Sequence, residues 1–109
     1  MSLINPIWLD VDKHTKALKA SGWYDTVSDT IDNSIIAVCA QRGVTIPTDV
    51  DGYIDSPFLR IIAVDFAIFS MLVGNWGVRD SDSQVYKEKA SYHWGQYDKN
   101  VKMLCPSLV

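Results

Sequence analysis

The sequence predicts an all-α fold, a small bundle of about four helices with an extended N-terminal arm and a short C-terminal tail. Apolar residues recur at helical spacing in several segments, and residues typical of helix caps and stops bound them. One segment, Ser56 to Val73, is apolar on almost every side. The acidic residues are nearly all aspartates, which favour helix starts and turns over helix interiors.

Length and composition indicate one domain, residues 1–109, with the arm at residues 1–9 and the tail at 105–109. The net charge of −3 argues against a dedicated nucleic-acid binder, which is expected to be basic. Two cysteines without CxxC spacing signal neither a zinc site nor a disulfide framework. The first residues do not read as a signal peptide, so we expect synthesis in a reducing cytoplasm.

The N-terminal arm is apolar but lacks helical periodicity, and Pro6 is expected to break any helix there. A short helix should follow, capped by Asp10 or Asp12 and running to about Ser21, with Gly22 as its stop. Its lysines form a possible basic face, which is either solvated or a contact for DNA or an acidic partner. The lysines of this face are Lys13, Lys16 and Lys19.

A second helix is predicted from Asp25 or Thr26 to Arg42, with Gly43 ending it. The following loop partly resembles a calcium-binding EF-hand loop. Aligning its Gly52 with the invariant glycine of that motif places Pro47 and Phe58 at ligand positions. We therefore interpret the loop as a turn.

The central helix should begin with Ser56 as its N-cap and Pro57 at its first position. A helix without a wide polar face must be wrapped by its own chain, by copies of itself, or by both. It is too short, and too interrupted by Arg60 and Asp65, to cross a bilayer, so no membrane association is expected.

Asp65 has no partner within its own helix, and Arg60 points about 140° away from it. We interpret both as buried or interfacial charges, and the partner of Asp65 must come from another helix or another subunit. Arg42, Arg79 or a Trp or Tyr donor are candidates. The alternative is a catalytic acid or base, in a small ligand-binding or enzymatic bundle that uses Asp65 and His93.

The last helix should start at Ser81, with Gln84 completing a capping box, and Pro106 should stop the chain from continuing it. Its apolar stripe includes His93, which, like His14, is interpreted as a core histidine rather than a ligand. No phosphate loop, zinc-protease motif or nucleophile elbow occurs in the sequence. We expect no enzyme activity, no metal and no cofactor.

The segment Leu59–Leu72, LRIIAVDFAIFSML, resembles a pattern of tailed-bacteriophage head–tail connector (adaptor) proteins. That family has a Leu-basic-x-x-Ala-x-Asp-apolar-Ala-x-aromatic-x-x-Leu helix followed by a loop and a Tyr-x-x-Ala helix. Here the second part is similar to Val85–Trp94, VYKEKASYHW. Upstream, Ile31–Pro47 resembles the family's helix that ends in Arg-aromatic-x-x-Pro, with Gly43 at the aromatic position.

The resemblance implies a structural subunit of the virion neck, made in the host cytoplasm and assembled as a ring, typically of twelve subunits, beneath the portal. Such a ring extends the DNA channel without sequence-specific binding and docks a stopper or tail-completion protein. At least one terminus is expected to become ordered on assembly, with the C-terminal tail contacting the portal protein. A generic oligomeric helical interaction module is the alternative. The candidate subunit or portal contacts are Ile7, Trp8, Trp76, Leu104, Leu108 and Val109.

Overall fold

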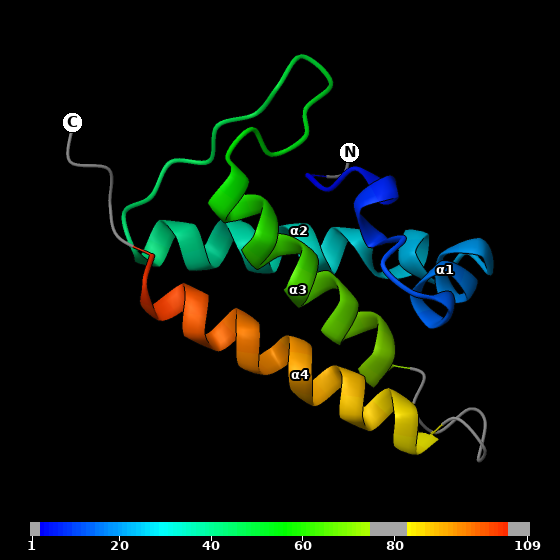
Figure 1. Ribbon diagram of the computed structural model, residues 1–109. Helices are drawn as coiled ribbons and strands as arrows, with labels where there is room; N and C mark the ends of the chain where they lie inside the picture. Colours follow the sequence, from blue (N-terminus) through cyan, green and yellow to red (C-terminus); the bar gives the residue numbers. More distant parts are fainter. Residues whose placement is uncertain (1–2, 75–82, 105–109) are drawn as a thin grey trace.

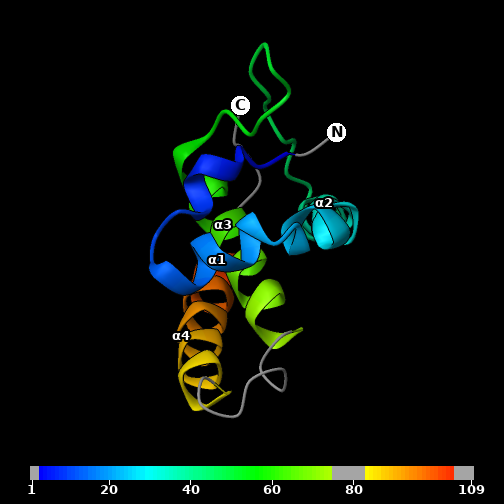
Figure 2. The ribbon, with the colours of Figure 1, turned by 90° about the vertical axis from the view of Figure 1, so that its right-hand side faces the viewer.

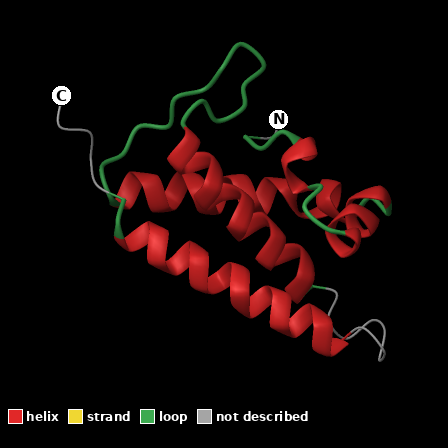
Figure 3. Cartoon of the chain, viewed as in Figure 1, coloured by secondary structure: helices red, strands yellow, loops and turns green. Residues whose placement is uncertain are grey.

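The computed structural model describes residues 3–74 and 83–104, and this part of the chain is mainly helical. A single turn of 3-10 helix precedes four α-helices, and Figure 3 shows only loops and turns between them. The prediction of an all-α fold with about four helices is confirmed. The elements are η1 (Pro6–Leu9), α1 (Lys13–Ala20), α2 (Trp23–Gln41), α3 (Pro57–Val73) and α4 (Ser83–Lys102).

Helix α3 lies at the centre of the bundle and contacts every other helical element. Its most extensive packing is against α4, which runs beside it in the opposite direction (Figure 1). Turning the molecule shows α2 and α4 on different sides of α3, with α1 at the near end (Figure 2). The strongly apolar helix is therefore wrapped by its own chain, which agrees with two of the three alternatives from the sequence: its own chain alone, or its own chain together with copies of itself.

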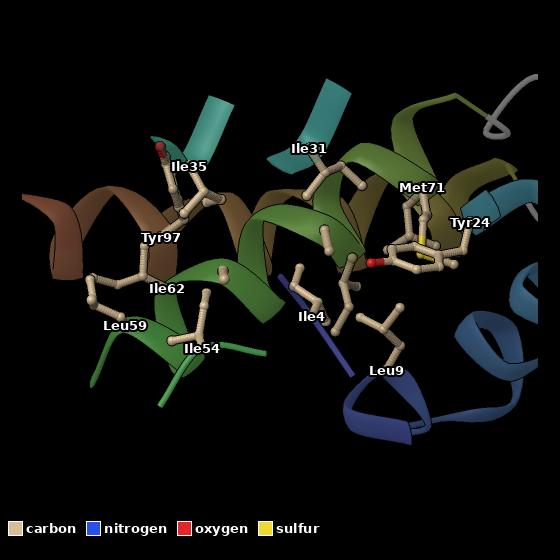
Figure 4. Close-up of a cluster of buried hydrophobic side chains, with 14 of the residues drawn as sticks. Ile4, Leu9, Tyr24, Ile31, Ile35, Ile54, Leu59, Ile62, Met71 and Tyr97 are labelled. Atoms are coloured by element: carbon tan, nitrogen blue, oxygen red, sulfur yellow. The ribbon is translucent and has the colours of Figure 1, made fainter. Parts of the chain in front are cut away.

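Buried side chains of α3 form the middle of the core. Ser56 caps the helix by accepting a hydrogen bond from the Leu59 N–H at 3.4 Å, as predicted. Ile31 and Ile35 of α2 pack on one side of α3, whereas Ile4 and Leu9 reach it from another (Figure 4). The buried residues of α3 are Leu59, Ile62, Ala63, Ala67, Ile68, Met71 and Leu72.

The N-terminal arm is less extended than the sequence predicts, because residues 6–9 form η1. The Asn5 side chain accepts a hydrogen bond from the Ile7 N–H at 3.1 Å and caps the turn. Pro6 opens this turn instead of breaking it, since a first-turn N–H needs no intrahelical acceptor. Ile4 and Leu9 are fully buried, so the described part of the arm packs on its own domain.

Two glycines with positive φ mark the ends of the first two α-helices. Gly22, at φ +86°, lies directly between α1 and α2, and Gly43, at φ +68°, follows the cap residue of α2. Both predicted stops are confirmed. Helix α2 begins at Trp23, a little earlier than predicted, because Gly22 itself serves as its N-cap.

The loop before α3 is a turn, as predicted. The Asp49 carboxylate accepts hydrogen bonds from the N–H groups of Asp51 at 2.8 Å and Tyr53 at 3.1 Å. An antiparallel bridge joins Thr48 to Ile54 and closes the turn. Val50 lies at its tip and is fully exposed.

The predicted start of the last helix at Ser81 lies outside the described residues. At the other end α4 stops at Lys102, shortly before Pro106. Within the ranges that the structure describes, no helix has both the length and the hydropathy needed to cross a membrane.

Candidate functional site

Asp65 and His93 form a contact between α3 and α4. Asp65 Oδ1 lies 2.8 Å from His93 Nδ1, and each side chain keeps 14% of its surface exposed. The prediction that the partner of Asp65 comes from another helix is confirmed. The suggested partner Arg42 is wrong, because its guanidinium donates instead to the Leu104 carbonyl at 3.2 Å. Arg79, the other suggested arginine, lies outside the described residues.

The Asp65–His93 pair has the geometry of an oriented imidazole. An ionised carboxylate only accepts hydrogen bonds, so it selects the imidazole form that carries a proton on Nδ1. Nε2 then has no hydrogen-bond partner among the described residues. The same carboxylate–imidazole arrangement serves general bases in hydrolases, but such sites add a nucleophile within hydrogen-bond reach of Nε2. In the described part of the chain no hydroxyl or thiol is hydrogen-bonded to His93.

A second pair, Asp12 and Lys89, joins the start of α1 to α4. Lys89 Nζ lies 2.6 Å from Asp12 Oδ2, while Asp12 Oδ1 caps α1 through the N–H groups of His14 and Thr15. Burial alone would raise the pKa of Asp12, but Lys89 and these backbone donors together hold the pKa below its ordinary value. Beside this pair, the His14 ring meets Tyr86 edge-on, with 5.3 Å between the ring centroids.

Exposed apolar side chains neighbour members of the two polar pairs along the chain. Val11 directly precedes Asp12, Tyr92 directly precedes His93, and Ile61 lies one turn before Asp65. They keep 55%, 62% and 52% of their surface exposed, respectively. We call Val11, Ile61 and Tyr92, together with the two polar pairs that they adjoin, the open face.

A group of aromatic rings from α3 and α4 packs together at the contact between these helices. Phe66 and Tyr97 have ring centroids 5.0 Å apart, and Phe69 and Trp94 have centroids 4.9 Å apart. Trp94 also neighbours Tyr97 at 5.4 Å and keeps 44% of its surface exposed. Burial raises the pKa of the Tyr97 hydroxyl. We call Phe66, Phe69, Trp94 and Tyr97 the aromatic face.

The predicted subunit or portal contacts differ in how exposed their side chains are. Ile7 is exposed, and its role as a subunit or portal contact stays a prediction. Trp8 is half-buried and already contacts its own chain, with the Tyr53 ring centroid 6.0 Å from its own. Leu104 is buried in the core, so as a free contact residue it is wrong: the apolar stripe of α4 continues past the helix end and into its own domain. The other three, Trp76, Leu108 and Val109, lie outside the described residues.

The other charged residues of the predictions have different outcomes. Arg60, predicted as a buried or interfacial charge, is not buried, so its interfacial role stays a prediction; its guanidinium carbon lies 4.2 Å from the centroid of the Trp8 ring. In the predicted basic face, Lys19 is taken up by an ion pair with Asp10 at 2.5 Å, because α1 turns this lysine toward the arm. Lys13 and Lys16 remain exposed, without an ion-pair partner among the described residues.

Sequence reasoning missed Asp32, a buried carboxyl of α2. Its Oδ1 accepts the Leu3 N–H at 3.2 Å, and its Oδ2 has no hydrogen-bond partner in the part of the chain that the structure describes. Burial raises the pKa of this carboxyl. A signal was present, since Asp32 follows Ile31 on the buried stripe of α2, but the group that it contacts comes from the non-helical start of the arm.

The described residues contain no group of three or more histidine, cysteine, aspartate or glutamate side chains that could hold a metal ion. No protein-family model, curated protein or solved structure matches this chain. The functional argument therefore rests on the open face, the aromatic face and the Asp65–His93 pair.

Proposed function

We propose that this protein is a structural subunit that assembles with copies of itself, and specifically a head–tail connector of a tailed phage. In this role it forms a ring beneath the portal protein, extends the DNA channel and docks the stopper or tail-completion protein.

The observation that carries the proposal is the exposure of large apolar side chains on α3 and α4, where Ile61, Tyr92 and Trp94 keep 52%, 62% and 44% of their surface exposed. The core of the domain is complete without them, because α3 already buries seven residues among the other elements. Exposed aromatic residues such as Tyr92 and Trp94 are enriched in the centres of protein interfaces. The specific assignment to a connector is supported by the sequence pattern of Leu59–Leu72, whose leucine and alanine positions, Leu59, Ala63, Ala67 and Leu72, are buried in α3.

The test is the mass of the protein at several concentrations, alone and with the portal protein encoded in the same genome. We expect a species of several subunits that forms or is stabilised on the portal ring. Assembly without any portal binding would favour a generic oligomeric module instead. A monomer at every concentration, with no portal binding, would contradict the proposal.

A second candidate function, a small ligand-binding or catalytic bundle, is favoured by one observation, the orientation of His93 by Asp65. The simplest ligand class is a small carboxylic acid, which can donate a hydrogen bond to Nε2 or accept one from it. Ring resonances of His93 would be followed by NMR during addition of such fragments. Specific shifts that disappear in Asp65→Asn would favour this candidate, whereas an unresponsive His93 would count against it.

A further inference from the structure

We propose that Leu3 and Ile4 form a strap across the core, which is held closed while Asp32 is protonated and opens more readily once Asp32 is ionised. The strap is a conformational device within one chain. It goes beyond the proposed assembly and does not depend on it.

The strap is bonded through both backbone groups of Leu3. Its N–H donates to Asp32 Oδ1 of α2 at 3.2 Å, and its carbonyl accepts from the Ile54 N–H at 2.8 Å. The next residue, Ile4, is fully buried and reaches α3 (Figure 4). The closed strap thus joins α2 to the loop before α3, and Leu3 lies directly against the Asp32 carboxyl.

The chain that follows the strap is fastened by different contacts. The Asn5 side chain caps η1 at 3.1 Å, and Lys19 Nζ of α1 lies 3.4 Å from the Pro6 carbonyl oxygen. On α3, the Arg60 guanidinium carbon lies 4.2 Å from the centroid of the Trp8 ring. None of these contacts involves α2 or Ile54. The turn η1 can therefore stay in place while the strap opens.

The Asp32 carboxyl is poorly suited to carry a charge while the strap is closed. The residue is 6% exposed, and its Oδ2 has no hydrogen-bond partner within the described residues. A buried carboxylate needs donors for both oxygens, whereas the neutral acid costs less to bury. Oδ1 can accept the Leu3 N–H in either state. Ionisation therefore weakens the closed strap, because opening lets water reach Oδ2.

The groups around Asp32 give the pH dependence its sign. Burial raises the pKa of Asp32, and the charge of Asp29 on the same helix also raises it, while the Leu3 N–H and the charge of the amino terminus lower it. In the described part of the chain, neither the arm, nor α3, nor the loop before α3 gives Asp32 an ion-pair partner. The strap is accordingly tightest below the ordinary pKa of 3.8 and loosens as the pH rises through the raised value.

Two neighbouring amides can report the opening separately. The Ile54 N–H loses its acceptor when the strap opens, whereas the Asp55 N–H is bonded within the loop, to the Pro47 carbonyl at 2.8 Å. Hydrogen exchange of both amides is followed by NMR between about pH 4 and about pH 7, where the amino terminus stays charged, and is corrected for the intrinsic exchange rate at each pH. We expect the protection of Ile54 to fall by at least about threefold as the pH rises, and that of Asp55 to stay constant.

Three variants locate the titrating group. Asp32→Asn is neutral at every pH and keeps an acceptor for Leu3, so it should abolish the fall. Asp25→Asn removes an exposed carboxylate from the same helix and should behave like the wild type. Asp29→Asn removes a charge that raises the pKa of Asp32, so it should reduce the fall without abolishing it. This last variant keeps the test valid if Asp32→Asn does not fold.

The outcomes that would overturn the inference are distinct. Constant protection of Ile54 in the wild type would show that Asp32 does not control the strap. A fall that persists unchanged in Asp32→Asn, or in Asp29→Asn if the first variant does not fold, would assign the pH dependence to another group. Parallel loss of protection at Ile54 and Asp55 would mean that the whole loop opens. In each case the proposed self-assembly, which uses other surfaces, is unaffected.

Discussion

The N-terminal arm and the α3–α4 contact show that regular structure and burial are separate properties in this protein. The described arm has one short turn of helix, yet Ile4 and Leu9 are fully buried. Helix α4 is long and regular, yet Tyr92 and Trp94 project from it into solvent. The least regular segment is therefore part of the core, whereas the most regular one also carries large apolar side chains at the surface.

The difference follows from how each segment satisfies its backbone. A helix satisfies its own N–H and C=O groups and can lie at the surface. The arm cannot, so the Leu3 N–H donates to Asp32 at 3.2 Å and the Leu3 carbonyl accepts from the Ile54 N–H at 2.8 Å. These contacts hold the arm against both α2 and the loop before α3.

The largest expected effect tests whether the arm is core. Ile4→Ala should lower the free energy of unfolding by about 2–5 kcal/mol, the usual range for removing a buried Ile side chain. Ile7→Ala, at an exposed position of the same arm, is the control and should change it by less than about 0.5 kcal/mol. Chemical denaturation measures both. Equal, small effects would show that the arm is not docked in solution.

The second prediction concerns the Asp65–His93 contact between α3 and α4. Asp65→Ala should reduce the free energy of unfolding by about 1.5–3 kcal/mol, because a hydrogen bond to a charged group is lost and His93 keeps an unsatisfied N–H near the core. Asp65→Asn, which retains an acceptor for His93, should lose less. The same denaturation measurement checks this order, and two equal losses would argue that the charge of Asp65 is irrelevant to its contact.

The third prediction separates the two roles of Asp12. Asp12→Ala removes both the cap of α1 and the Lys89 partner, so it should cost about 0.5–2 kcal/mol. Asp12→Ser keeps a capping oxygen and removes only the ion pair, which should contribute about 1 kcal/mol or less at a half-exposed site. If Asp12→Ser is as destabilising as Asp12→Ala, the ion pair outweighs the cap.

The pH dependence of the same residue has a defined sign. The pKa of Asp12 is lowered in the folded protein from its ordinary value of 3.8. Its contribution to stability is therefore present above about pH 3.8 and is lost as the pH falls through the folded pKa. Denaturation of wild type and Asp12→Ser between pH 6 and about pH 2 should show the two curves converge on acidification.

The smallest effect is expected at Asp32, where the pH dependence of stability has the opposite sign to that of Asp12. Burial raises the pKa of this carboxyl, so folding favours the protonated form and the stability contribution of Asp32 improves as the pH falls through the raised value. Asp32→Asn should remove this trend and change stability at neutral pH by no more than about 1 kcal/mol. A trend that persists in the variant would have to come from another group.

The sequence predicted most of the helices because their signals are local. Ser56 and Pro57 start α3, Gly22 and Gly43 end α1 and α2, and each signal acts within a few residues. The central position of α3 followed from its apolar surface alone. The arm was harder, since its burial depends on groups supplied by α2 and by the loop before α3.

The candidate site was only half predictable. Asp65 stood out as a charge without a partner in its own helix, and His93 was named with it only in one alternative. The pairing could not be predicted because neither helix sequence determines how α3 and α4 are aligned against each other. Lys89 could not be paired with Asp12 for the same reason. The exposure of Ile61 and Tyr92 could not be predicted either, because each is an apolar or aromatic residue in a helix whose other apolar residues are mainly buried.

The two backbone contacts of Leu3 also fix an order of events during synthesis. The arm leaves the ribosome before its acceptor at Asp32 and its donor at Ile54, which emerge only as α2 and the following loop are made. Until then Ile4 and Leu9 must remain exposed on the nascent chain. Residues of the arm are thus made before the groups that bury them, and a chaperone or a delay in translation near Ile54 would act on them directly.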